Sequence, residues 1–126
     1  MPTPGWASIS LPSEIGGGGM PIALSGGTLE ILSSANLAFG LAPGLSAGAI
    51  SAINFHGSEE QKEKFLPKLV SGEWTGTMNL SEPQSGSDLG TITTKAEPQD
   101  DGTYKITGTK VWITFGEHDM TDNIIH

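Results

Sequence analysis

The spacing of hydrophobic positions changes near the middle of the chain, at Gly72. Before this residue, apolar side chains recur at intervals of three and four residues, which is typical of amphipathic helices. After it, apolar and polar residues alternate or β-branched residues cluster, which indicates strands. This order predicts an α+β protein: a helical segment, residues 1–72, followed by the start of an antiparallel β-domain, residues 73–126.

Three short helices are expected in the first segment, after an irregular stretch at residues 1–20 that is rich in proline and glycine. Ser58 and Gln61 have the spacing of a capping box, which predicts the start of the third helix. Gly57 is expected to end the second helix in a left-handed conformation, and Pro67 to bend the third. The expected helices run from Pro21 to Phe39, from Pro43 to His56 and from Ser58 to Ser71.

Several stretches of the second segment have the composition of strands, separated by turn residues. The runs on either side of Gly108 and Thr109 are expected to pair as a hairpin, and residues 100–102 to form a second turn. A sheet this small leaves its edges unpaired, so the chain is expected to be a fragment of a longer protein. The expected strands are residues 74–80, 91–96, 104–107, 110–114 and 123–126.

The net charge of the chain is −8, and its six basic residues are all lysines, of which Lys62 is the first. This balance argues against nucleic-acid binding, which requires a basic surface. There is no cysteine, and the three histidines are too far apart in the sequence to predict a metal site. No apolar run reaches membrane-spanning length and no signal peptide is evident, so a cytoplasmic protein without a membrane span is expected.

The loop at residues 82–88 contains more small and polar residues than a turn requires. Glu82 precedes Pro83, which favours an extended entry into the loop. Gly86 would let the backbone approach a ligand, while exposed amides and the hydroxyls of Ser85 and Ser87 could bind an anion. The alternative is an ordinary connecting loop in which the side chain at position 88 closes an Asx turn.

A second candidate feature is Trp112-Ile113-Thr114. In a strand, Trp112 and Thr114 point to the same face and Ile113 to the other. An indole beside a hydroxyl is a suitable platform for a flat heteroaromatic ring. The alternative is a core tryptophan next to an exposed threonine.

Taken together, the stretches LSEPQSGSDLG and TKAEPQDDGTYKITGTKVWITFG resemble the central region of the acyl-CoA dehydrogenase family. That family has a strand, then T-E-P-x-A-G-S-D, an acidic turn, and a hairpin ending in N-G-x-K-x-W-I-T-N-G. The stretch HGSEEQKEKFLPKLVSGEWTGTMNLSEP is similar to the family's run from its amino-terminal helical domain into its first β-strand. The resemblance begins near Gly5, and the motifs EPQ-G-SDL and GEHD are closest to the longer bacterial branch. Two positions depart from the pattern: Ser81 replaces threonine and Phe115 replaces asparagine.

The resemblance implies an FAD site built on this loop and the tryptophan segment. It implies that the Leu80 backbone and the Ser81 hydroxyl meet the pyrimidine edge of the flavin, and that Gly86 and Ser87 meet the phosphates. Ser87 would also lie beside the acyl-CoA substrate. The cofactor-binding residues that it implies are Met78, Leu80, Ser81, Gly86, Ser87, Trp112, Ile113 and Thr114.

Trp112 would cover the isoalloxazine, and Thr114 would bond near its N5 atom. Hydrogen-bond donors around a flavin favour the negative charge that it gathers on reduction. The implied reaction is oxidation of the Cα–Cβ bond of an acyl-CoA thioester to the 2-enoyl-CoA, with electron-transfer flavoprotein as the expected acceptor. The parent protein is expected to be a homo-oligomer.

No acid in this chain matches the family's catalytic base, which is expected in the carboxyl-terminal helical domain that the chain lacks. Glu82 is expected to be structural. The fragment alone is therefore expected to be inactive. Three other interpretations stay open: an acyl-CoA oxidase, a flavoprotein of the alkylation-response type, and a non-enzymatic α+β interaction module.

Overall fold

The computed structural model describes residues 5–125, and the chain forms two compact units. One unit contains the residues up to Met78 together with those from Thr114 onward, and the other is Asn79–Ile113. Three α-helices precede four short strands in the described part of the chain, so the expected α+β class is confirmed.

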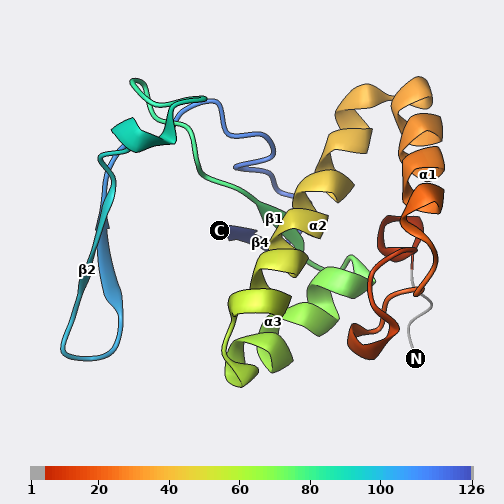
Figure 1. Ribbon diagram of the computed structural model, residues 1–126, viewed down its shortest axis with the longest axis horizontal. Helices are drawn as coiled ribbons and strands as arrows, with labels where there is room; N and C mark the ends of the chain where they lie inside the picture. Colours follow the sequence, from red (N-terminus) through yellow and green to blue (C-terminus); the bar gives the residue numbers. More distant parts are fainter. Residues whose placement is uncertain (1–4, 126) are drawn as a thin grey trace. The chain divides into compact units, whose positions relative to one another are not determined.

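The helices of the first unit are α1 (Ile22–Ala35), α2 (Leu37–His56) and α3 (Glu59–Ser71). α2 contacts both of the other helices, which Figure 1 shows beside it. The predicted boundary at residues 39–43 is wrong, because Asn36 ends α1 and its side chain accepts a hydrogen bond of 3.0 Å from the Phe39 amide. This N-cap starts α2 early, and Pro43 is accommodated inside the helix.

Local capping determines the limits of α3. Gln61 N donates to Ser58 Oγ over 3.2 Å and Ser58 N donates to Gln61 Oε1 over 2.9 Å, which confirms the capping box. Gly72 ends the helix in the left-handed region, with φ of 77°. The left-handed stop predicted at Gly57 is wrong: its φ is −70° and ψ 153°, because the chain continues extended into the Ser58 cap. Pro67 lies inside α3 as expected, and the bend there stays a prediction.

The chain before α1 is irregular as expected, apart from the short 3₁₀ turns Trp6–Ser8 and Ser13–Ile15. The hydrophobic core of the unit lies where α2 and α3 meet. Its buried members are Ile50, Leu66, Leu69 and Val70.

By length and composition alone, α2 could cross a membrane, which differs from the expectation from the sequence. Its neighbours in the first unit are α1, α3 and β1 (Thr75–Thr77), and its buried residues are Gly40, Ala49 and Ile50.

A parallel pair of strands completes the first unit. β1 pairs with β4 (Asn123–Ile125), and Thr75 lies opposite Asn123 in the register. The strand expected at the end of the chain is thus confirmed up to Ile125, while His126 lies outside the described residues. Of the stretch expected at residues 74–80, only Thr75–Thr77 has regular strand structure.

The second unit carries an antiparallel hairpin of β2 (Lys95–Pro98) and β3 (Tyr104–Thr107). The expected turn at residues 100–102 joins these strands, and Gly102 adopts a φ of 82°. The hairpin predicted around Gly108 is wrong, because β3 pairs with β2 instead. Gly108 has a different role: a Cβ there would overlap the side chain of Thr94.

Candidate functional site

The loop that follows β1 begins with a tight turn. Glu82 N donates to Ser85 O over 2.8 Å, and Ser85 N donates to Glu82 O over 3.0 Å. Pro83 occupies the second position of this turn, where its fixed φ is favourable. The turn fixes the point from which Gly86 and Ser87 extend.

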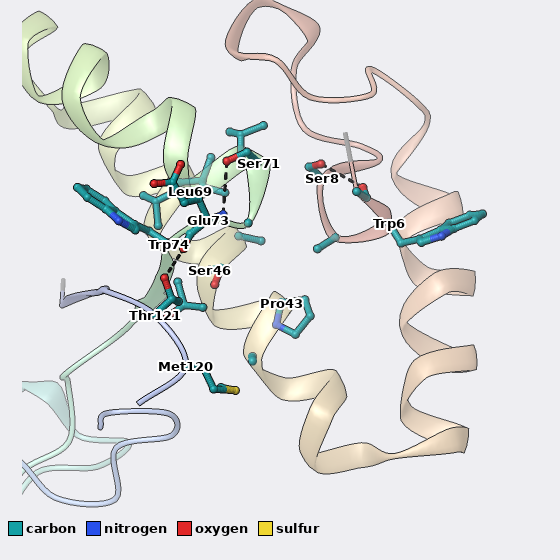
Figure 2. A pocket seen from close by; sticks show the side chains of 18 of the residues that line it. Trp6, Ser8, Pro43, Ser46, Leu69, Ser71, Glu73, Trp74, Met120 and Thr121 are labelled. Carbon is teal, nitrogen blue, oxygen red and sulfur yellow. Dashed lines mark hydrogen bonds between the residues drawn. The ribbon is translucent and has the colours of Figure 1, made fainter. Parts of the chain in front are cut away.

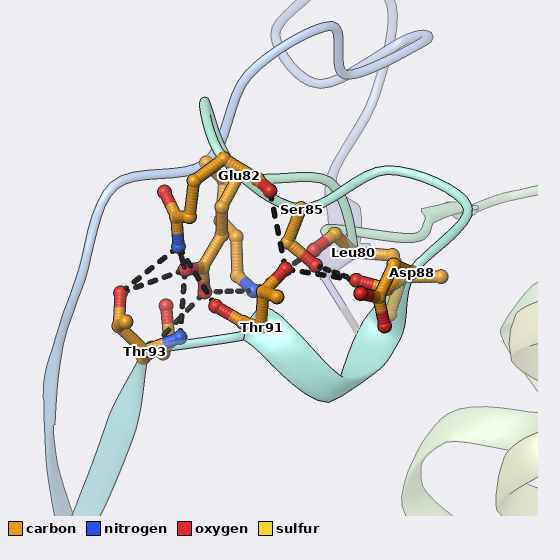
Figure 3. A network of polar contacts seen from close by, with 9 residues as sticks. Leu80, Glu82, Ser85, Asp88, Thr91 and Thr93 are labelled. Atoms are coloured by element: carbon orange, nitrogen blue, oxygen red, sulfur yellow. Dashed lines mark hydrogen bonds and ion pairs between the residues drawn. The ribbon is translucent and has the colours of Figure 1, made fainter.

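The Glu82 carboxylate is the centre of the polar network that Figure 3 shows. Its side chain is only 1% exposed. Oε1 accepts from Thr94 N at 3.0 Å and from Lys110 Nζ at 2.9 Å. Oε2 accepts from both the amide and the hydroxyl of Thr93, each at 2.9 Å. Hydrogen bonds from Thr94, Thr93 and Lys110 hold the pKa of the Glu82 carboxyl well below its usual range.

These bonds define the role of Glu82. A carboxylate with so low a pKa is a poor proton acceptor near neutral pH, and both of its oxygens are already occupied. The network supports the interpretation of Glu82 as structural. It ties the turn to the segment before β2 and to Lys110.

The two serines of the loop differ in their surroundings. Ser85 is 1% exposed, and its hydroxyl donates to Asp88 O over 2.8 Å. The prediction that the Ser85 hydroxyl binds an anion is therefore wrong. Asp88 Oδ1 accepts from Gly90 N over 3.0 Å, which is the Asx turn weighed as the alternative.

By contrast, Gly86 and Ser87 are exposed. Within residues 5–125, their amides and the Ser87 hydroxyl have no acceptor or donor in the protein. A Cβ at Gly86 would meet nothing within 4 Å, so the space above this backbone is open. The same loop therefore contains both the Asx turn and the exposed amides. The Ser87 hydroxyl, unlike that of Ser85, is available to a ligand.

Trp112 lies on irregular chain, and the strand predicted for residues 110–114 is wrong. The reason is a pair of contacts between residues far apart in the sequence: Val111 N donates to Ser81 O over 2.9 Å and Lys110 Nζ to Leu80 O over 3.0 Å, so this segment bonds to the chain before the loop rather than to β3. The same-face argument for Trp112 and Thr114 consequently fails.

The conformation of Trp112 is nevertheless informative. Its φ is 59°, in the left-handed region that costs a bulky residue energy, and its side chain is 91% exposed. The alternative of a core tryptophan does not hold in this chain. An exposed indole on a strained backbone is typical of a functional surface.

Six of the predicted cofactor residues lie in the unit Asn79–Ile113, and the bonds just described bring the chain at Leu80 and Ser81 next to Val111. Met78 and Thr114 belong to the other unit. In that unit, Thr114 is exposed, while its carbonyl accepts from the buried Thr77 Oγ1 over 2.6 Å.

An apolar cavity of about 590 Å³ lies in the first unit (Figure 2). Glu73 is the one ionisable side chain among the lining residues described, so the cavity offers no acid–base pair or ligand set for chemistry. No group of three metal-binding side chains occurs in the described residues. The residues that line the apolar cavity and are labelled in Figure 2 include Trp6, Pro43, Leu69, Trp74 and Met120.

Comparison with known proteins decides the family. A model described as the acyl-CoA dehydrogenase N-terminal domain matches residues 1–73, and one described as the acyl-CoA dehydrogenase middle domain matches residues 77–122. The chain belongs to the acyl-CoA dehydrogenase family. The resemblance noted in the sequence is thereby confirmed.

Individual relatives agree with this assignment. The chain is 54% identical to 3-methylmercaptopropionyl-CoA dehydrogenase of Ruegeria pomeroyi, over 97% of the chain and 21% of that protein. Butyryl-CoA dehydrogenase of Megasphaera elsdenii has a similar structure, with a TM-score of 0.81 and 31% identity over 89% of this chain and 30% of its own. An acyl-CoA dehydrogenase of Bacillus anthracis, solved in complex with FAD, gives a TM-score of 0.74 and 36% identity over 86% of this chain and 19% of its own.

The chain therefore spans about a fifth of the length of the curated relative from Ruegeria. Within this acyl-CoA dehydrogenase segment, three residues escaped the sequence-based site prediction: Lys110, Thr77 and Asn123. Lys110 gave a weak signal, since it is the lysine of the family pattern N-G-x-K-x-W. Thr77 and Asn123 donate hydrogen bonds to the backbone carbonyls of Thr114 and Phe115, contacts that no short motif reveals.

Proposed function

We propose that the protein to which this chain contributes is an FAD-dependent dehydrogenase that oxidises the Cα–Cβ bond of an acyl-CoA thioester to the 2-enoyl-CoA. The observation that carries this proposal is the 54% identity, over nearly the whole chain, to a protein named as 3-methylmercaptopropionyl-CoA dehydrogenase. The identity of the acyl group is set by parts of the protein beyond these residues.

The loop fits the phosphates of FAD. Phosphate oxygens accept hydrogen bonds, and the amides of Gly86 and Ser87 with the Ser87 hydroxyl form a group of donors that have no partner in the described chain. The absence of a Cβ at Gly86 leaves room for a ligand to approach the backbone. Glu82 and Lys110 neutralise each other beneath the loop, so the buried carboxylate does not repel an anion as an isolated charge would.

Trp112 fits the flat ring system. An exposed indole offers a large aromatic face, and stacking would recover the energy that its left-handed backbone costs. Thr114 would contribute a hydroxyl to the ring, Met78, Leu80, Ser81 and Ile113 would complete the contacts, and Ser87 would also meet the acyl-CoA.

Bound FAD would supply the oxidant, accepting the β-hydrogen of the substrate as hydride while a base takes the α-proton. Glu82 cannot be that base, because its oxygens are occupied and its pKa is lowered. We therefore assign the base to the part of the protein outside this chain, and expect residues 1–126 alone to be inactive. The domain boundary near Gly72, the cytoplasmic location, the homo-oligomeric state and electron transfer to an electron-transfer flavoprotein belong to the same proposal.

The test uses the complete protein. It should purify with flavin absorbance, and Trp112→Ala and Ser87→Ala should each lower the amount of FAD retained after gel filtration. Trp6→Ala and Ser13→Ala are matched controls at exposed positions of the other unit, and should retain FAD as the wild type does. If both Trp112→Ala and Ser87→Ala retain as much FAD as the wild type, the proposed site is contradicted. A colourless wild-type protein would favour an interaction module.

A second assay separates the related activities. A dehydrogenase should reduce an electron-transfer flavoprotein faster than oxygen with an acyl-CoA substrate, and an oxidase should produce hydrogen peroxide. A flavoprotein that retains FAD and oxidises no acyl-CoA would match the alkylation-response alternative.

A further inference from the structure

The two faces of β1 contact different parts of the first unit. In a strand, side chains alternate between faces, so Thr75 and Thr77 point to one side and Gly76 to the other. Gly76 faces α2: its amide donates to Ser46 Oγ over 3.1 Å. Thr77 is fully buried, and its Oγ1 donates to the carbonyl of Thr114 over 2.6 Å.

Asn123 of β4 holds the next carbonyl. Its Nδ2 donates to Phe115 O over 2.8 Å, which fixes the orientation of the amide. Its Oδ1 accepts from Thr75 Oγ1 over 3.0 Å. Since the single hydroxyl proton of Thr75 is used in this way, Thr75 Oγ1 accepts from His118 Nε2, 2.9 Å away.

The result is a clamp on two consecutive carbonyls, those of Thr114 and Phe115. The clamp holds a strained turn, because Phe115 has a φ of 53° although it carries a bulky side chain. The Thr114 side chain itself is exposed, and within the described residues it has no hydrogen-bond partner. Strain that is held firmly, beside a free hydroxyl, marks a site prepared for a ligand.

We propose that Thr77 and Asn123 are positioning residues, which fix the backbone that presents the Thr114 hydroxyl to the flavin. This inference rests on the proposed function, since it requires a flavin at Thr114. Thr77 acts through the Thr114 carbonyl and Asn123 through the Phe115 carbonyl. Neither touches the ligand.

The experiment is a double-mutant cycle in the complete protein. Thr77→Val keeps the shape of the side chain and removes the donor, and Thr114→Val removes the hydroxyl that is to be positioned. The readouts are the dissociation constant of FAD from reconstituted apoprotein, the midpoint potential of the bound flavin, its visible spectrum and the thermal midpoint. Thr107→Val, at an exposed position of β3, is the control for the chemical change.

Thr77→Val should shift the potential and spectrum of the flavin in the same direction as Thr114→Val. It should weaken FAD binding between about twofold and about tenfold, the range expected for one hydrogen bond. In the Thr114→Val background, the same change should leave the flavin potential and spectrum unaltered while still lowering the thermal midpoint. Asn123→Asp, which keeps the acceptor for Thr75 and loses the donor to Phe115, should behave likewise.

The outcomes separate this inference from the proposed function. If the wild-type protein binds no FAD, the proposed function fails and this inference fails with it. If FAD binds but Thr77→Val and Asn123→Asp lower only the thermal midpoint, the residues are structural and the inference is overturned alone. An equal shift with and without the Thr114 hydroxyl would also overturn it, because the effect would not pass through that residue.

Discussion

At the scale of single residues, Glu82 shows how an acidic side chain can be excluded from catalysis by its hydrogen bonds. Two backbone amides, a hydroxyl and an ammonium group all donate to it, and its exposed fraction is close to zero. Removing the charge would leave donors of Thr93, Thr94 and Lys110 facing a neutral group, and charge-assisted bonds are the stronger kind.

Glu82→Gln should therefore lower the thermal midpoint of the complete protein and reduce FAD retention, because the loop that carries Gly86 and Ser87 loses its anchor. Differential scanning calorimetry and flavin absorbance measure the two effects. Glu97→Gln is the matched control, since Glu97 lies exposed in β2 of the same unit. A variant as stable as the wild type would mean that the network in Figure 3 contributes nothing to the fold.

The identity of Glu82 as a structural residue was predictable, because the following Pro83 places it in a turn. The conformation of Trp112 was not. Its neighbours Val111 and Ile113 are β-branched, so the sequence favours a strand, whereas the bond from Val111 N to Ser81 O diverts the chain. Such a bond depends on residues far apart in the sequence, and local propensity does not report it.

At the scale of elements, the sequence Thr-Gly-Thr of β1 explains how a short strand can contact α2 on one face and the carbonyl of Thr114 on the other. Gly76 allows the strand to lie against α2, and a Cβ there would overlap the side chain of Ala49. The Cβ atom of Ala49 is attached directly to the backbone of α2, and a Cβ at Gly76 would be attached directly to the backbone of β1. Neither atom can therefore move aside without shifting its helix or strand.

Gly76→Ala should destabilise the protein by about 1–3 kcal/mol, the range for overpacking a well-packed core. Gly26→Ala is the informative contrast. Gly26 lies in α1, and a methyl group added there would meet nothing within 4 Å, so alanine should stabilise the helix by up to about 1 kcal/mol. Denaturant unfolding of both variants checks the opposite signs, and equal effects would contradict the packing argument.

The hydrophobic period predicted the existence of all three helices, and the capping box located the start of α3. It could not locate the boundary between α1 and α2, because Asn36 acts through one side-chain hydrogen bond inside a continuous apolar pattern. The pairing of β1 with β4 was also beyond the sequence, since the partners lie more than forty residues apart.

At the scale of the whole molecule, two carboxyl groups with a lowered pKa fall in one unit. The pKa of Glu82 is lowered by its bonds to Thr94, Thr93 and Lys110, and that of Asp101 by its bonds from the side chain and amide of Thr103. A carboxyl with a lowered pKa in the folded state stabilises the fold above its unfolded pKa and loses that contribution as the pH falls.

The unit Asn79–Ile113 should thus lose stability first on acidification, starting below about pH 4.3, the ordinary value for glutamate. Hydrogen exchange of the complete protein, corrected for intrinsic rates, should show peptides of this unit exchanging faster at about pH 3.5 than at about pH 6, while peptides of α2 change less. Glu82→Gln should flatten this dependence. Equal pH dependence in the two units would contradict it.

Large apolar side chains are exposed along the two longest helices of the first unit, including Ile22, Ile31 and Phe55, which are 80%, 72% and 76% exposed. Apolar side chains this exposed, and this numerous along two helices, are typical of a surface that another part of a protein or another chain covers. Residues 1–126 produced alone should therefore bind a hydrophobic dye and self-associate in sedimentation velocity, and the complete protein should do so much less. Ile31→Glu with Phe55→Glu should reduce self-association of the isolated chain, whereas Glu14→Gln, at an exposed position outside these helices, should not. A monomeric isolated chain that binds no dye would show that these side chains are tolerated in water and cover no interface.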